Sequence, residues 1–161
     1  MNLFQKIQLK KDIRDQKNEE AYQILTSYEN CHLIVLKYLT NIEIHINHYF
    51  SRVQLETFSI TLVQLCEKLK EYSNVLLEKY TYIKANKKEL KTFKNDKRIN
   101  VNIILEDSKH IVMCVQDLCK LLNSIPHYNS NITKAKAIVN EVYDNFLTAH
   151  GLKNDKLEKQ I

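Results

Sequence analysis

Two short motifs in this sequence have the spacing of metal ligands on one face of a helix. Residues 29–32, ENCH, match Glu-x-x-His, and residues 107–110, DSKH, give an aspartate variant of that spacing. Di-iron helical bundles combine two such motifs with a glutamate from each remaining helix, all facing inward. Here Glu67 and Glu141 fall one position off the apolar seams, towards solvent. We therefore predict no metal site and no cofactor.

The histidines have simpler interpretations than metal binding. His32 lies on an apolar seam, and we predict that it is a neutral core imidazole, hydrogen-bonded to Tyr28 or Tyr72. His45 and His48 have an i, i+3 spacing that could serve two metal ligands. We favour the interpretation that they are polar residues at the tip of a helical hairpin.

Nucleophilic catalysis and phosphate binding commonly use glycine-containing loops, and this chain has a single glycine. A nucleophile elbow, an oxyanion loop or a P-loop cannot form from it. The four cysteines, at positions 31, 66, 114 and 119, form no CxxC pair and have no zinc-finger spacing to histidine. We expect four reduced thiols that behave as small apolar side chains. The chain is predicted not to be an enzyme.

The positive charge of the chain is concentrated in one stretch. Residues 84–100, KANKKELKTFKNDKRIN, hold seven basic side chains against two acidic ones, and this surplus equals the formal net charge of +5. We favour a solvated helix end, because cations complement the negative end of a helix. The alternative is a site for nucleic acid or acidic lipid. Its basic residues would be Lys84, Lys87, Lys88, Lys91, Lys94, Lys97 and Arg98.

Tyrosine supplies nine of the fourteen aromatic side chains. Several tyrosines lie beside the apolar seams, where a large amphipathic ring can serve at the centre of an interface. The alternative is a ring that lies along its own bundle with the hydroxyl in water. The candidate partner-binding residues are Tyr22, Tyr38, Tyr49, Phe50 and Tyr82, and Tyr128 is placed similarly.

Composition favours an all-helical fold. One glycine and one proline leave almost no positions for hairpin turns, and 161 residues suit one domain, 1–161. The N-terminus has no continuous apolar segment, and no apolar run is long enough to span a bilayer. We expect a soluble, intracellular protein of the cytoplasm or the nucleus.

Two long apolar seams with alternating three- and four-residue steps predict a helical hairpin. Residues 51–54, SRVQ, have the form of a capping box and separate the two helices, so the first helix should end near Tyr49. The first seam is Ala21, Leu25, Tyr28, His32, Val35, Leu39, Ile42, Ile46 and Tyr49. The second is Leu55, Phe58, Leu62, Leu65, Leu69, Tyr72, Leu76, Tyr80 and Ile83, and residues 84–93 should extend this helix.

Two further helices follow. The third should be capped by Asp96 or Asn100 and end before Pro126, and the fourth should be capped by Asn131 and closed by Gly151. The third seam is Val101, Ile104, Ser108, Ile111, Val115, Leu118, Leu122 and Ile125. The fourth is Ile132, Ala135, Val139, Val142, Phe146 and Ala149.

The predicted fold is all-α, an antiparallel up-down four-helix bundle with a longer N-terminal helical hairpin. Residues 1–20 should be a weakly packed extension and residues 152–161 a frayed tail. The hairpin seam covers about 28 residues, or ~42 Å, against about 17 residues, or ~26 Å, for the last helix. Part of the hairpin over residues 21–83 should therefore remain uncovered.

An uncovered apolar seam predicts a non-enzymatic interaction module, an adaptor or subunit of an intracellular protein assembly. It would bury an amphipathic helix of a partner protein, or a second copy of itself. The alternative function is a binder of anionic surfaces, nucleic acid or acidic membrane lipid, through residues 84–98.

Overall fold

The fold is all-α, as predicted. The computed structural model describes residues 1–48, 55–91 and 100–152, and no strand occurs in these ranges. The predicted capping box at 51–54 and the tail beyond residue 152 lie outside them. The helices are α1 (Leu3–Asn47), α2 (Leu55–Ala85), α3 (Lys87–Leu90), α4 (Val101–Asn123) and α5 (Ser130–Ala149). Within the described ranges, none is long and apolar enough to cross a membrane.

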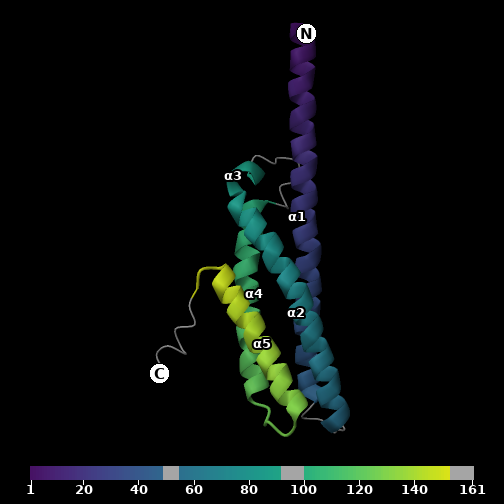
Figure 1. Ribbon diagram of the computed structural model, residues 1–161, viewed down its shortest axis with the longest axis vertical. Helices are drawn as coiled ribbons and strands as arrows, with labels where there is room; N and C mark the ends of the chain where they lie inside the picture. Colours follow the sequence, from purple (N-terminus) through teal and green to yellow (C-terminus); the bar gives the residue numbers. More distant parts are fainter. Residues whose placement is uncertain (49–54, 92–99, 153–161) are drawn as a thin grey trace.

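The four long helices pack side by side around a common core. Helix α2 contacts α1 and α5, and α4 contacts the same two helices. In Figure 1, α1 and α4 run down the view, whereas α2 and α5 run up it. The N-terminal part of α1 extends well beyond the other helices (Figure 1). The chain therefore consists of a packed body and a projecting helix.

The predicted seams form the core of that body. Leu65, Tyr72 and Ala149 are half-buried, and every other seam residue whose burial is described is buried. The largest fully buried side chains are Tyr28, Phe58, Phe146, Leu25, Ile42, Ile46, Leu62, Leu69, Leu76, Ile83, Ile104 and Ile111. Alternating three- and four-residue steps thus identified the inward face of each long helix correctly.

Asparagine side chains cap α1, α4 and α5. Asn100 caps α4 as predicted, because its Oδ1 accepts a hydrogen bond from the Ile103 N–H at 2.9 Å. The prediction of Asn131 as the cap of α5 is wrong, since Asn129 accepts from the Ile132 N–H at 3.0 Å. Both residues are asparagines that precede the same apolar seam, so the sequence alone did not distinguish them.

Helix α5 ends in a Schellman motif. Gly151 has a φ of +67°. Its N–H donates to the Thr148 carbonyl at 3.1 Å, and the Leu152 N–H donates to the Leu147 carbonyl at 2.8 Å. A residue with a side chain rarely adopts this φ, so the only glycine of the chain stands where the helix must stop.

Residues 84, 85 and 87–90 are helical, as predicted, but they do not form one continuous helix. Helix α2 ends at Ala85, Asn86 has φ −108° and ψ 24°, and the four-residue α3 follows. The Tyr82 carbonyl accepts two hydrogen bonds from Asn86 at the break, one from its backbone N–H at 3.0 Å and one from its side-chain amide at 2.8 Å. Residues 92 and 93 lie outside the described ranges.

Two polar groups fix α5 to its neighbours. The buried Ser59 hydroxyl on α2 accepts a hydrogen bond from the Asn129 amide at 3.0 Å. The Lys136 ammonium is buried and donates to the Ile125 carbonyl just beyond the end of α4. A cation beside the carbonyl end of a helix is favourable, which compensates for its burial.

Candidate interaction surfaces

Along most of the N-terminal arm, residues 3–20 of α1, none of the described helices packs against it. Every residue from 1 to 20 is exposed except the half-buried Asn18. A capping box starts the helix: the Gln5 N–H donates to Asn2 Oδ1 at 2.8 Å, and the Asn2 N–H donates to Gln5 Oε1 at 3.0 Å. These bonds satisfy two orphan donors at the free end of the arm.

The arm carries large apolar side chains in full contact with water. Leu3, Phe4 and Ile7 are 74%, 75% and 58% exposed. At 3.6 residues per turn they fall within about 100° of the helix circumference, and we name them the arm stripe. Leu9 and Ile13 are also exposed and lie on the opposite side. A helix apolar on more than one side is typical of a buried one.

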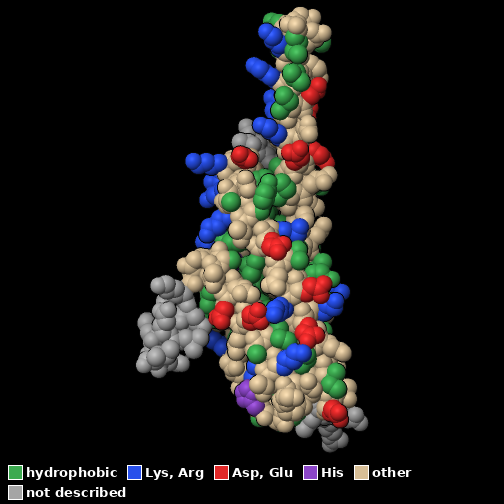
Figure 2. All heavy atoms as spheres, in the orientation of Figure 1, with side chains coloured by type: hydrophobic (Ala, Val, Ile, Leu, Met, Phe, Trp, Pro, Cys, Tyr) green, Lys and Arg blue, Asp and Glu red, His purple; other side chains and the backbone are tan. Residues whose placement is uncertain are grey.

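The arm stripe lies between edges of opposite charge. Figure 2 shows basic side chains along one side of the arm and acidic ones along the other. Helical spacing assigns Lys6, Lys10 and Lys17 to the basic edge and Asp12, Asp15 and Glu19 to the acidic edge. Lys11 and Arg14 continue the line of the arm stripe towards the body. Such paired edges set the orientation of a partner helix in coiled coils.

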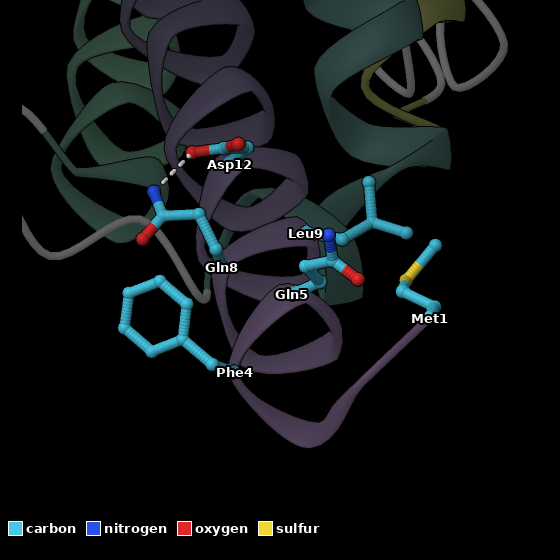
Figure 3. Close-up of a pocket in the computed structure, with 6 residues that line it drawn as sticks. All are labelled: Met1, Phe4, Gln5, Gln8, Leu9 and Asp12. Atoms are coloured by element: carbon cyan, nitrogen blue, oxygen red, sulfur yellow. Dashed lines mark hydrogen bonds between the residues drawn. The ribbon is translucent and has the colours of Figure 1, made fainter.

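A shallow hollow lies on the same arm. Its walls are Met1, Phe4, Gln5, Gln8, Leu9 and Asp12, all within or just before the first turns of α1. Figure 3 shows Phe4 and Leu9 projecting to different sides of the helix, with Gln8 donating to Asp12. Because one helix supplies every wall, the hollow is open and cannot enclose a small ligand. It can only complement a surface brought by another molecule.

The prediction that part of the 21–83 hairpin stays uncovered is wrong. Its seam is buried up to Ala21 on α1 and Ile83 on α2. The break at Asn86 accounts for part of this, because Leu90 of α3 is buried and lines one hollow with Ala21. The most exposed apolar side chains instead include those of the arm, which the sequence had suggested was only weakly packed.

A second surface is a groove between α4 and the ends of α2 and α5, with a volume of about 910 Å³. Its floor is mainly apolar, and both Met113 and Leu152 are at least half exposed, at 62% and 50%. Three lysines line it, against the single carboxylate of Glu106. The lining residues are Tyr80, Lys84, Lys87, Asn102, Leu105, Glu106, Lys109, Val112, Met113, His150 and Leu152.

His150 lies in the wall of this groove with both ring nitrogens engaged. Nδ1 is 2.8 Å from the Phe146 carbonyl, and Nε2 is 2.8 Å from the Ser108 hydroxyl. The ring stacks on Tyr80 at 4.2 Å between centroids. Burial lowers the pKa of His150, and the positive charges of Lys84 and Lys109 lower it further. His150 therefore offers a neutral ring face.

The predicted anion-binding lysines are only partly described. Lys84, Lys87, Lys88 and Lys91 are exposed, and within the described ranges none of them forms an ion pair. The Lys84 ammonium lies 5.9 Å from the centroid of the Tyr80 ring. Two of these lysines face the groove, and Lys88 and Lys91 do not line it. Lys94, Lys97 and Arg98 lie outside the described residues.

The predicted partner-binding aromatics are dispersed. Tyr82 is exposed and lies near the base of the arm, where it lines a hollow with Lys17 and Ala21. Tyr22 is also exposed. Tyr38 is half-buried and stacks on Tyr72 at 5.5 Å, along its own body. Half-buried Tyr128 packs against the core, and Tyr49 and Phe50 lie outside the described residues.

The two metal-like motifs face the α1–α4 contact. His32 is buried as predicted, and its ring lies 5.9 Å from that of Tyr28. The predicted hydrogen bond is wrong, because Nδ1 of His32 and the Tyr28 hydroxyl are buried without partners. Burial lowers the pKa of His32. In the described part of the chain, no group of three metal-ligating side chains could hold an ion.

Glu67 and Glu141, which lie off the seams, are exposed and form ion pairs between α2 and α5. Glu67 pairs with Lys134 at 3.1 Å, and Glu141 pairs with Lys70 at 3.0 Å. His45 is half-buried rather than a free tip residue, since its Nε2 lies 2.9 Å from the Phe58 carbonyl. These residues therefore have structural partners.

All four cysteines are free thiols. Burial raises the pKa of Cys66 to about 12 and that of Cys119 to about 11. Burial likewise raises the pKa of Cys31 and of the half-buried Cys114. A thiol with a raised pKa is a poor nucleophile at neutral pH.

Comparisons with protein-family models, curated proteins and solved structures find no match for this chain. The groove was missed from the sequence, because its walls come from α2, α3, α4 and the end of α5, which are separated along the chain. One signal was available: Lys109 and Met113 lie one turn apart on α4 and off its seam. That spacing indicates an outward face of α4 but does not show which other helices lie beside that face.

Proposed function

We propose that this chain is a non-enzymatic interaction module, an adaptor or subunit of an intracellular protein assembly. The four long helices form an antiparallel up-down bundle that includes the C-terminal part of α1, and the arm projects from it. The observation that carries the proposal is the arm stripe, three large apolar side chains on a well-capped helix with no helix beside them. Exposed apolar faces of this kind mark protein interfaces.

The occupant we propose is an amphipathic helix of another protein. Its apolar face would cover Leu3, Phe4 and Ile7, with acidic residues facing the basic edge and basic residues facing the acidic edge. A second copy fits less well, because Lys11 and Arg14 lie on the line of the stripe. In a parallel pair of arms these cations would face one another, and facing like charges are destabilising. Tyr22 and Tyr82 could extend the interface at its base.

Affinity purification with paired baits tests this function. One bait is the full chain, and the other lacks residues 1–17, which are all exposed, so its body should still fold. Matched thermal melts would establish that. We expect a defined protein that co-purifies with the first bait and is lost with the second. Identical sets of co-purifying proteins would contradict the proposal.

The alternative function, binding to nucleic acid or acidic lipid, is supported by Lys84, Lys87, Lys88 and Lys91, which are exposed and form no ion pair with any described residue. Its signature is salt dependence. Changing all four lysines to Gln should flatten the slope of log affinity against log salt for duplex DNA by about 3 to 4. If the unaltered chain does not bind duplex DNA at low salt, or if the four-lysine variant binds it as tightly as the unaltered chain, nucleic-acid binding through these lysines is excluded.

A further inference from the structure

The groove of α2, α4 and α5 combines features that the arm does not have. Its floor is apolar and accessible, because Met113 and Leu152 line it and are 62% and 50% exposed. Methionine adapts its shape to different apolar partners, which makes it frequent on peptide-binding surfaces. The floor can therefore contact an apolar side chain without a rearrangement of the helices that form it.

Lysines from separate elements converge on this floor. Lys84 ends α2, Lys87 begins α3 and Lys109 belongs to α4, and all three line the groove. Lys84 and Lys109 act on the same imidazole, since both charges lower the pKa of His150. None of the three forms an ion pair within the described residues. Against them stands one acidic side chain, Glu106, so the groove attracts negative charge.

The dimensions of the groove suit a helix. Along α4 it runs from Asn102 to Met113, a span of eleven residues, or about 16 Å at 1.5 Å per residue. That length matches about three turns of a second helix. The ring nitrogens of His150 are occupied internally, so this side chain offers an apolar ring face to a bound helix rather than a hydrogen-bond donor or acceptor.

We propose that this groove binds a short acidic amphipathic helix of a partner protein. The apolar face of that helix packs on Met113, Leu152 and Tyr80, and its carboxylates lie beside the lysines. The site is separate from the N-terminal arm and does not rest on the function proposed for it. Either surface can bind while the other does not.

The probe is a synthetic helical peptide of about 14 residues, with Leu on one face and Glu on both flanks. Two control peptides have the same residues in scrambled order, or Lys in place of every Glu. Fluorescence anisotropy measures binding to the full chain. We expect saturable binding of the acidic peptide that weakens as salt is raised. The scrambled and Lys peptides should bind at least about tenfold more weakly, because they lack the apolar face or carry the wrong charge.

A charge-swap variant tests whether the acidic peptide binds in this groove rather than elsewhere on the chain. The double variant Lys84→Glu with Lys109→Glu should lose about tenfold or more in affinity for the acidic peptide and gain affinity for the Lys peptide. The matched control, Lys37→Glu with Lys120→Glu, changes the same net charge at exposed positions that do not line the groove. It should lose less than about threefold, through long-range charge alone.

Three results would overturn the proposal. The first is no saturable binding of the acidic peptide by the unaltered chain. The second is an equal loss in the charge-swap variant and its control, which would show a general charge effect. The third is binding to phosphatidylglycerol vesicles that the charge swap abolishes while the peptide is not bound, which would assign the groove to acidic lipid.

Discussion

Replacing the arm stripe by Gln, as Leu3→Gln, Phe4→Gln and Ile7→Gln together, should abolish partner binding while leaving folding intact. Burying a whole Leu, Ile or Phe side chain contributes ~1.5–3 kcal/mol. These side chains still expose 74%, 75% and 58% of their surface, so a covering partner would gain roughly 1–2 kcal/mol from each. The sum is ~3–6 kcal/mol, which predicts binding weaker by more than about 100-fold.

The stability of the variant should hardly change. Each substituted side chain already contacts water, and Gln is a good helix former, so each change should shift the free energy of unfolding by ~0.5 kcal/mol or less. The assay is a titration of the co-purified partner against the chain, with a parallel thermal melt. The matched control is Leu33→Gln, a 61% exposed position further along α1. Equal weakening in both variants, or none in either, would refute the role of the arm.

Three further predictions concern the body. Lys136→Met leaves a buried carbonyl without its donor and should lower the free energy of unfolding by ~1–3 kcal/mol, whereas Lys134→Met, which removes only an exposed ion pair, should cost less than ~1 kcal/mol. Asn129→Ala removes a helix cap and should cost ~1–2 kcal/mol, against a smaller loss for Asn131→Ala. The folded-state pKa of His150 lies below 6.5. Its contribution to the free energy of unfolding is therefore complete above pH 6.5 and decreases as the pH falls below that value. His150→Gln should reduce this dependence of the free energy of unfolding on pH.

Urea unfolding checks each of these predictions. A loss of stability in the Lys134 variant as large as in the Lys136 variant would mean that burial of the ammonium is unimportant. Equal losses in the two asparagine variants would contradict the assignment of the cap. If the His150 variant kept the full slope below pH 6.5, other groups would be responsible for it.

The inward faces of the helices could be predicted because each depends only on the local spacing of apolar residues along the sequence. Leu25 and Leu76, for example, lie on simple three- and four-residue steps and are fully buried. Ser59 and Lys136 are buried off the seams, because α2 and α5 each have two helical neighbours. A single seam indicates only one of those neighbours.

The surfaces were harder to predict, because they depend on where one element stops relative to another. Helix lengths indicated an uncovered apolar region, but they placed it on the hairpin rather than on residues 3–13. The break at Asn86, which brings Leu90 beside Ala21, has no distinctive local signal, since asparagine also occurs within helices. The groove likewise exists only after α4 packs beside the ends of α2 and α5.

Photo-crosslinking from single positions on α1 tests the central claim most directly. A photoreactive amino acid replaces Phe4 in one version of the chain and Leu33 in another, both exposed apolar positions on the same helix. After irradiation in the cells that express the chain, the account predicts a discrete crosslinked protein from position 4 and none from position 33. The same pattern from both positions, or no adduct from position 4, would contradict it.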